Sequence, residues 1–113
     1  MRRISTHILD LVHGKPASGV PVRLEKQTDG DWKVLNSEIT DQDGRCAQLL
    51  RESEEMSAAV YRLIFDTGSY YSQKQINALY PVAEVTFRAR DNESHFHIAL
   101  LLSPNGYTTY RGS

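Results

Sequence analysis

A strict alternation of apolar and polar residues recurs along this chain, and it limits the folds that the chain can adopt. The pattern is clearest in "VPVRLEK" (20–26), "AVYRLIFD" (59–66) and "VAEVTFRAR" (82–90). Because successive side chains of a β-strand point to opposite faces of the sheet, a period of two indicates strands with one buried and one solvated face. Such strands bury their apolar faces when two sheets pack together.

Turn-forming sequences separate the alternating segments. They are "HGKPASG" (13–19), "TDGD" (28–31), "TDQDG" (40–44), "RDNES" (90–94) and "SPNG" (103–106). Seven or eight short strands at this spacing predict an all-β fold, a two-layer β-sandwich. The segment "QLLRESEEMSA" (48–58) is charged and ambiguous, and we expect a loop or an irregular edge there.

One segment has the character of a helix. In "SYYSQKQINALYP" (69–81), good helix formers lie between Ser72, a possible N-cap, and Pro81, which cannot continue a helix. We therefore predict one short helix near residues 72–79.

Size and charge exclude several classes of function. The 113 residues suit a single domain over residues 1–113, and mixed charges with a net charge of −1 offer no basic field for nucleic acid or an anionic membrane. Cys46 is the only cysteine, so no intrachain disulfide is possible. The first apolar run is too short for a signal peptide, and no run approaches the roughly 20 apolar residues of a membrane span. We expect a cytoplasmic protein.

Two histidines stand at alternate positions in "SHFHIALLL" (94–102). In a strand, His95 and His97 share one face and lie roughly 6.6–7 Å apart. The pair suits a metal site, a catalytic base with a neighbour, or a solvated strand face. The other histidines, His7 and His13, bring no Cys/His cluster with them, so we predict no structural zinc site. A site made of histidines alone stays an alternative.

His7 and Arg45 are two further candidates. His7 shares its parity with Ser5 and two leucines in "STHILDL", so we expect mostly apolar surroundings, in which it is a hydrogen-bonded structural residue or a base. Arg45 follows the turn "TDQDG", where Gly44 can take a positive φ and place Arg45 at the root of a strand. The guanidinium lies at the surface or presents its donors to the oxygens of a ligand.

The chain closes on Tyr110, Arg111, Gly112 and Ser113. In one interpretation Tyr110 packs at a sheet edge and the rest is a solvated tail. In the other, Gly112 lets the chain bend so that Ser113 folds back into a cavity, where its hydroxyl and carboxylate bind a substrate or orient a histidine. Periodicity alone does not distinguish the two.

Taken together, four segments resemble the transthyretin-like family over essentially the whole chain, and within it the 5-hydroxyisourate hydrolases rather than the hormone-carrying transthyretins. They are "THILDLVHGKPASGVPVRLE", "TDQDGRC", "YRLIFDTGSYY" with the following "LYPVAEVTF", and "HFHIALLLSPNGYTTYRGS". The last is the most specific, because the hormone carriers lack the closing Tyr-Arg-Gly-Ser. Two positions depart from the pattern: Ala99 stands where the family commonly has proline, and Asn105 where it commonly has tyrosine.

The resemblance implies a transthyretin-like (prealbumin-like) β-sandwich of two four-stranded sheets with one short helix. It implies a homotetramer, a dimer of dimers, with active sites in the grooves where two dimers meet. The implied reaction is hydrolysis of 5-hydroxyisourate to 2-oxo-4-hydroxy-4-carboxy-5-ureidoimidazoline in urate (purine) catabolism, with no cofactor and no metal. The implied partners are this substrate and further copies of the chain, with no nucleic acid and no membrane.

The resemblance also implies the site residues. Carried over position by position, the catalytic residues fall on His7, Arg45, His97 and Ser113, and the substrate-binding residues on His7, Arg45, Tyr110, Arg111 and Gly112. In this scheme the two histidines bracket a water, and which one is the base stays open. Arg45 holds the substrate and stabilises negative charge on oxygen. Ser113 positions the water or an imidazole, and Tyr110 shapes the pocket.

Three other interpretations remain. A carrier of apolar hormones needs an apolar channel, whereas the matching positions here hold histidines and an arginine. A structural or adhesion sandwich would tolerate loss of the last four residues. A covalent mechanism through Ser113 lacks a visible Asp-His pair to activate the hydroxyl.

Overall fold

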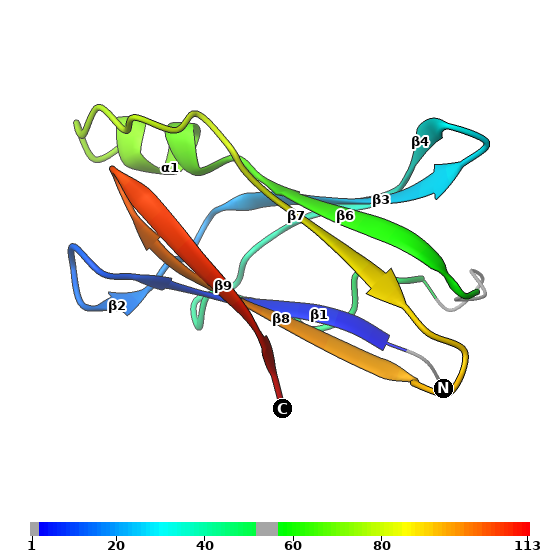
Figure 1. Cartoon of the computed structure of the whole chain (residues 1–113). Helices are drawn as coiled ribbons and strands as arrows, with labels where there is room; N and C mark the ends of the chain where they lie inside the picture. Colours follow the sequence, from blue (N-terminus) through cyan, green and yellow to red (C-terminus); the bar gives the residue numbers. More distant parts are fainter. Residues whose placement is uncertain (1–2, 52–56) are drawn as a thin grey trace.

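Two β-sheets and one short helix make up the protein (Figure 1). The computed structural model describes residues 3–51 and 57–113. The strands are β1 (Arg3–Asp10), β2 (Lys15–Pro16), β3 (Pro21–Thr28), β4 (Asp31–Ile39), β5 (Arg45–Cys46), β6 (Ala59–Phe65), β7 (Ala83–Ala89), β8 (His95–Ser103) and β9 (Gly106–Gly112). The helix is α1 (Thr67–Ser72). The predicted all-β sandwich is confirmed.

One sheet matches the prediction and the other has an additional strand. The first contains four strands in the order β4-β3-β6-β7. The second has the order β2-β1-β8-β9, and β5 also pairs with β1, so the described residues form five strands there rather than the predicted four. The fifth strand is possible because β2 and β5 have only two residues each, so both can pair with β1, at different parts of its length.

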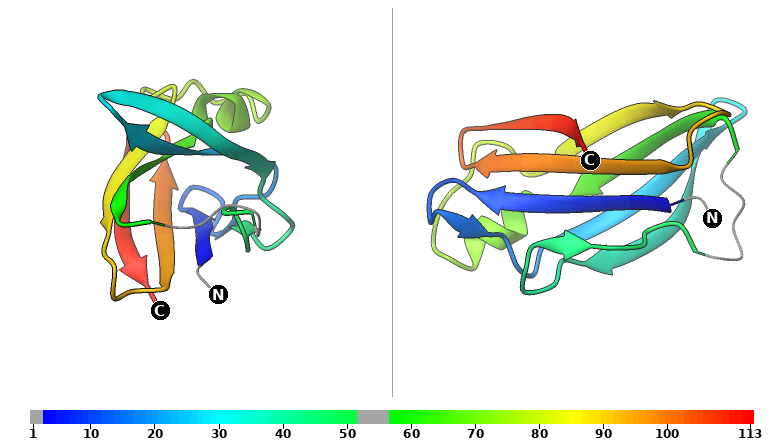
Figure 2. Two further views of the ribbon diagram at one scale, coloured as in Figure 1. Left: turned by 90° about the vertical axis from the view of Figure 1, so that its right-hand side faces the viewer. Right: turned by 90° about the horizontal axis from the view of Figure 1, so that it is seen from below.

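The pairing of β1 with β8 brings the first strand and the last two strands of the chain into one sheet. These strands run parallel over their shared length, and β9 pairs antiparallel with β8 so that His97 lies opposite Gly112. Figure 2 shows β1, β8 and β9 side by side in one sheet, with the C-terminus at the end of β9. Residues far apart in the sequence therefore share one face.

The core lies between the two sheets. The inward side chains of β8, all 5% exposed or less, are Phe96, Ile98, Leu100 and Leu102. The Phe87 ring of β7 joins the sheets, because its centroid lies 5.9 Å from that of Tyr61 and 5.8 Å from that of Phe96. The opposite parity of β8, which includes His95 and His97, therefore faces outward.

The helix lies earlier than predicted, over Thr67–Ser72 rather than 72–79. Its N-cap is Asp66, whose carboxylate accepts hydrogen bonds from the backbone N–H (3.2 Å) and the hydroxyl (2.8 Å) of Ser69. Ser72, the predicted N-cap, is instead the last helical residue. An Asp side chain caps a helix as well as a Ser does, and the helix formers after Ser72 lie in a turn (73–75) and in an irregular segment (76–79) instead.

Two smaller findings complete the fold. Within the described part of the chain, no helix has the length and apolar character needed to cross a membrane. Of the segment 48–58, where we predicted a loop or irregular edge, residues 48–51 and 57–58 contain neither helix nor strand, and residues 52–56 lie outside the described residues.

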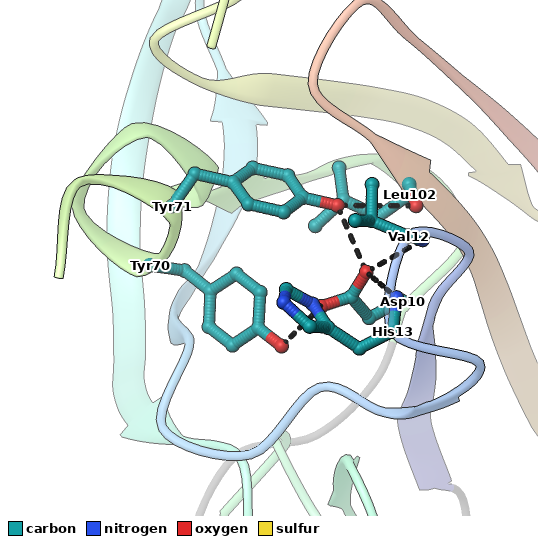
Figure 3. Close-up of polar contacts among 6 residues, drawn as sticks. All are labelled: Asp10, Val12, His13, Tyr70, Tyr71 and Leu102. Atoms are coloured by element: carbon teal, nitrogen blue, oxygen red, sulfur yellow. Dashed lines mark hydrogen bonds and ion pairs between the residues drawn. The ribbon is translucent and has the colours of Figure 1, made fainter. Parts of the chain in front are cut away.

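A buried carboxylate joins α1 to the end of β1 (Figure 3). Asp10 is 1% exposed and accepts hydrogen bonds from the hydroxyls of Tyr70 (2.6 Å) and Tyr71 (3.2 Å). It also bonds to Nδ1 of His13 (2.6 Å) and to the backbone N–H of Val12 (2.9 Å). Burial alone would raise the pKa of Asp10, but the hydrogen bonds from Tyr70 and His13 outweigh it and hold that pKa below its usual 3.8.

Asp10→Ala should lower the free energy of unfolding by about 3 kcal/mol, because it leaves the buried Tyr70 hydroxyl without its acceptor. Asp66→Ala, which removes only the helix cap, should cost about 1 kcal/mol. Since the folded-state pKa of Asp10 is lowered, its contribution is present above the usual value of 3.8 and is lost in stronger acid. Chemical denaturation at several pH values measures both effects. Equal losses in the two variants would contradict this account.

Candidate active site

His7 and Arg45 are direct neighbours on adjacent strands. The register of β1 and β5 pairs them, so their side chains share one face of the sheet. That face is the outer one, because Ile8, the next residue along β1, is fully buried. The apolar surroundings predicted for His7 are only partly present, since the residue beside it across β1 and β5 is an arginine. Both parities of β1 contain apolar residues, so parity alone does not identify the core face.

The turn before β5 has the predicted conformation. Gly44 takes a positive φ of 74°, and an added Cβ there would lie 2.5 Å from the carbonyl oxygen of Ile8. The carboxylate of Asp41 accepts hydrogen bonds from the backbone N–H of Asp43 (2.9 Å) and of Arg45 (3.0 Å). This tight turn sets Arg45 at the root of β5, as the sequence predicted.

His97 lies in the middle of the outer face, between β1 and β9. Its Nδ1 atom is 2.8 Å from the hydroxyl oxygen of Ser5, which pairs with it across β1 and β8. The ring centroids of His95 and His97 are 6.4 Å apart, so the predicted sharing of one face is confirmed. Both rings are half-buried.

One pocket brings together three of the predicted site residues, Arg45, His97 and Ser113. It has a volume of about 190 Å³, and its lining includes Arg3, Ser5, Arg45, His95, His97 and Ser113. His7 lies beside this pocket through its pairing with Arg45. Tyr110 pairs with Ala99 on the same outer face and is 53% exposed, but it is not part of the lining.

The C-terminal segment reaches the pocket without a bend. The strand β9 continues to Gly112, whose φ is not positive, so the bend at this glycine, which one of the two interpretations invoked, is not needed to bring Ser113 to the pocket. The glycine is needed for another reason: an added Cβ would lie 2.6 Å from Cδ2 of His97. The His97 ring packs directly on the Gly112 backbone, and the strand then carries Ser113 into the pocket lining.

The Arg111 side chain points away from the pocket. Its register partner is Ile98, which faces the core, so the guanidinium lies on the other side of β9 from His97. There it forms an ion pair with Glu93, donates a hydrogen bond to the carbonyl oxygen of His95 (2.9 Å), and lies 4.7 Å from the Phe96 ring centroid. These contacts anchor the end of β9.

Burial and the positive charges around the pocket lower the pKa of both candidate imidazoles. Burial lowers the pKa of His7, and the positive charge of Arg45 lowers it further. Burial also lowers the pKa of His97, followed by the charges of Arg45, His7, His95 and Arg3. A neutral imidazole has a free lone pair, so either ring can accept a proton near neutral pH.

Five further residues of the lining were not assigned from the sequence: Arg3, Ser5, Thr6, Cys46 and Ala47. Ser5 and Arg3 occupy alternate positions of β1, on the face of His7, and this parity is the signal that could have identified them. Cys46 also lines the pocket, but burial, with the negative charges of Glu38 and Asp41, raises its pKa to about 12. Its thiol stays protonated and is a poor nucleophile.

Potential metal ligands do not gather in threes in the described ranges. No group of three or more His, Cys, Asp or Glu residues among 3–51 and 57–113 is placed to hold a metal ion. In the pocket itself, His95 and His97 are the potential nitrogen ligands, and guanidinium groups surround them.

The fold and the pocket together define a transthyretin-like β-sandwich with a histidine-arginine site on its outer face. Residues 4–112 match the model of the HIUase/Transthyretin family, and the chain belongs to that family.

The chain is similar to members of both branches of the family, the 5-hydroxyisourate hydrolases and the transthyretins. The 5-hydroxyisourate hydrolase of Salmonella dublin is 46% identical over 110 residues, which cover 97% of this chain and 80% of that protein. The solved structure of the Klebsiella pneumoniae 5-hydroxyisourate hydrolase has a TM-score of 0.87 and 34% identity, covering 100% of both chains. Transthyretin from Sparus aurata has a TM-score of 0.91 and 36% identity, covering 99% of this chain and 97% of that one. The fold alone therefore does not separate the hydrolases from the transthyretins, and the distinction has to come from the site residues.

Proposed function

We propose that this chain hydrolyses 5-hydroxyisourate to 2-oxo-4-hydroxy-4-carboxy-5-ureidoimidazoline, a step of urate catabolism that needs no cofactor. The observation that carries the proposal is the pocket shared by Arg45, His97 and Ser113, with His7 beside Arg45. The hydrolases among the relatives support the same reaction. A planar substrate rich in carbonyl oxygens suits guanidinium and hydroxyl donors better than an apolar pocket.

In the proposed mechanism, a water attacks a carbonyl carbon of the six-membered ring while His7 or His97 removes its proton. The new carbon–oxygen bond forms, the carbon–nitrogen bond of the cyclic amide breaks, and the nitrogen takes up a proton with the help of the other imidazole. Arg45 holds the substrate and stabilises the negative charge that develops on the carbonyl oxygen. Ser113 positions the water or an imidazole. Tyr110 would shape the side of the pocket, and the backbone of Arg111 and Gly112 would line its end.

A covalent route through Ser113 has less support. Activation of a serine nucleophile requires a base within hydrogen-bond reach of its hydroxyl. The hydroxyl that forms a hydrogen bond with Nδ1 of His97 is that of Ser5. Attack by water is therefore the preferred form of the mechanism.

We further propose a homotetramer, a dimer of dimers, in which a second copy covers the outer face of β1, β8 and β9. Two features support it. The strands β7 and β9 are at the edges of their sheets, where another strand can pair. Large apolar side chains are also exposed around this sheet, with Leu11 58%, Val12 50% and Tyr110 53% exposed. A cytoplasmic location and a single domain over residues 1–113 belong to the same proposal.

A carrier of an apolar aromatic ligand is the second candidate, favoured by the structural likeness to Sparus aurata transthyretin. The polar groups of His7, Arg45 and His97 on the outer face argue against it, because an apolar ligand would leave them unpaired. Tight binding of such a ligand without turnover of 5-hydroxyisourate would favour the carrier.

The direct test is an ultraviolet assay on freshly generated 5-hydroxyisourate, with and without the protein. The substrate also decays unaided, so the measured quantity is the acceleration over that background. We expect a rate proportional to protein concentration. Decay at the background rate with folded protein present would overturn the proposed function.

The pH dependence of kcat/KM offers a second check. Because the pKa values of His7 and His97 both lie below the usual 6.5, the neutral bases persist into mildly acidic solution. We expect kcat/KM to stay level near pH 7 and to fall only as the pH drops below 6.5. Arg45→Gln removes a charge that lowers both pKa values, so its acid limb should move to higher pH. A wild-type midpoint above pH 6.5 would contradict this assignment.

A further inference from the structure

We propose that Ser5 and His95 are positioning residues, which hold the His97 ring in one tautomer and one orientation. The inference rests on the proposed function and adds to it two residues with no assigned part in the reaction. Both lie on the outer face beside His97 and both line the pocket.

The contacts place a hydroxyl between two imidazoles. Ser5 is 6% exposed, and its Oγ lies 2.8 Å from Nδ1 of His97 and 3.4 Å from Nε2 of His95. The backbone fixes this arrangement, because Ser5 is the register partner of His97 across the parallel strands β1 and β8. The histidines themselves are two residues apart on β8.

The hydrogen bonds from His97 through Ser5 to His95 can be assigned so that His97 acts as a base. If Nε2 of His97 is to accept a proton from water, Nδ1 must carry the ring hydrogen. Nδ1–H then donates to the Ser5 oxygen, and the Ser5 hydroxyl donates to Nε2 of His95. In this assignment each of the two hydrogen bonds has one donor and one acceptor, and the lone pair on Nε2 of His97 stays free.

The opposite edge of the His97 ring is also held. Gly112 lies against this edge, where an added Cβ would come within 2.6 Å of Cδ2 and 3.5 Å of Nε2. The ring is therefore fixed between Ser5 and Gly112, and Nε2 is the nitrogen left for a water. Burial favours the neutral ring, the state that has two tautomers. The charged or titratable groups that surround the ring from β5 (Arg45), β1 (His7, Arg3) and β8 (His95) favour it further.

In Ser-His-Asp hydrolases the catalytic imidazole is oriented by a carboxylate bonded to Nδ1. Here Ser5, backed by His95, takes the place of that carboxylate beside Nδ1 of His97, and both side chains are neutral in this arrangement. A neutral partner stabilises the imidazolium less than a carboxylate does, so the effect on rate should be that of an ordinary hydrogen bond, about tenfold.

Nitrogen NMR of the full-length, ligand-free protein tests the tautomer without any substrate. We expect wild-type His97 to carry its hydrogen on Nδ1, Ser5→Thr to keep this form, and Ser5→Ala to lose the preference. Ser103→Ala, which removes a hydroxyl from the far end of β8, is the matched control and should leave His97 unchanged. A wild-type hydrogen on Nε2, or an unchanged His97 signal in Ser5→Ala, would overturn the proposal.

Kinetics on 5-hydroxyisourate provide the second readout. We expect Ser5→Ala to lower kcat about tenfold with little change in KM, and Ser5→Thr to restore it. His95→Gln should retain most activity, because its amide oxygen can accept from Ser5, whereas His95→Leu should behave as Ser5→Ala does. An unchanged kcat in folded Ser5→Ala would refute the positioning role. If the wild type itself fails to accelerate decay but the NMR result holds, only the proposed function fails.

Discussion

His97→Ala and Arg45→Ala should each lower kcat/KM for 5-hydroxyisourate by about 10²–10⁴, which brings the observed decay close to background. The first removes an imidazole from the pocket, and the second removes a guanidinium that lines the same pocket. Neither side chain belongs to the core, so both variants should stay folded. Initial rates at several substrate concentrations measure the loss.

Two controls sharpen this experiment. Arg88→Ala removes an exposed arginine of β7 on the other sheet and should retain wild-type kinetics. Arg45→Lys keeps the charge but loses the two-pronged donor geometry, so its activity should fall between those of the wild type and Arg45→Ala. Full activity in either alanine variant, with circular dichroism like the wild type, would remove that residue from the proposed mechanism.

Gly112→Ala should lower kcat/KM by about 10², because the added methyl group overlaps the His97 ring and displaces it. The expected loss comes from contact and not from backbone strain, since the φ of Gly112 lies outside the left-handed region. The same assay measures it, together with thermal unfolding.

Gly106→Ala is the matched control on the same strand. A Cβ at this position meets no atom within 4 Å, so both activity and stability should stay close to wild type. If Gly112→Ala is as active as Gly106→Ala, the His97 ring is not held against β9 in the way the structure indicates.

Alternation was a reliable guide to the strands because burial follows the same period. In β6, for example, Tyr61, Leu63 and Phe65 are fully buried, whereas the residues between them are partly exposed. The helix was misplaced because two residues, Asp66 and Ser72, can each act as an N-cap, and local sequence does not show which one does. The tertiary contacts of the following tyrosines with Asp10 are what the local pattern lacks.

The site was predictable only in part. The resemblance named His7, Arg45 and His97, and the structure brings them to one face. The pairing of β1 with β8 joins segments about ninety residues apart, and no local pattern encodes it. Parity places Ser5 on the face of His7, but only this pairing brings its hydroxyl to His97. The resemblance also named Arg111 as substrate-binding, and the register of β9 turns its guanidinium to the side away from His97.

The parallel pairing of the first and eighth strands also determines when the pocket can exist. A nascent polypeptide emerging from the ribosome would hold His7 long before His97 and Ser113 are synthesised. Contacts of such large sequence separation form late, since the long intervening segment must be ordered first. Turnover should therefore begin only after β9 has been synthesised and has paired with β8, and stalled fragments that lack this strand should be inactive even where their other sheet has formed.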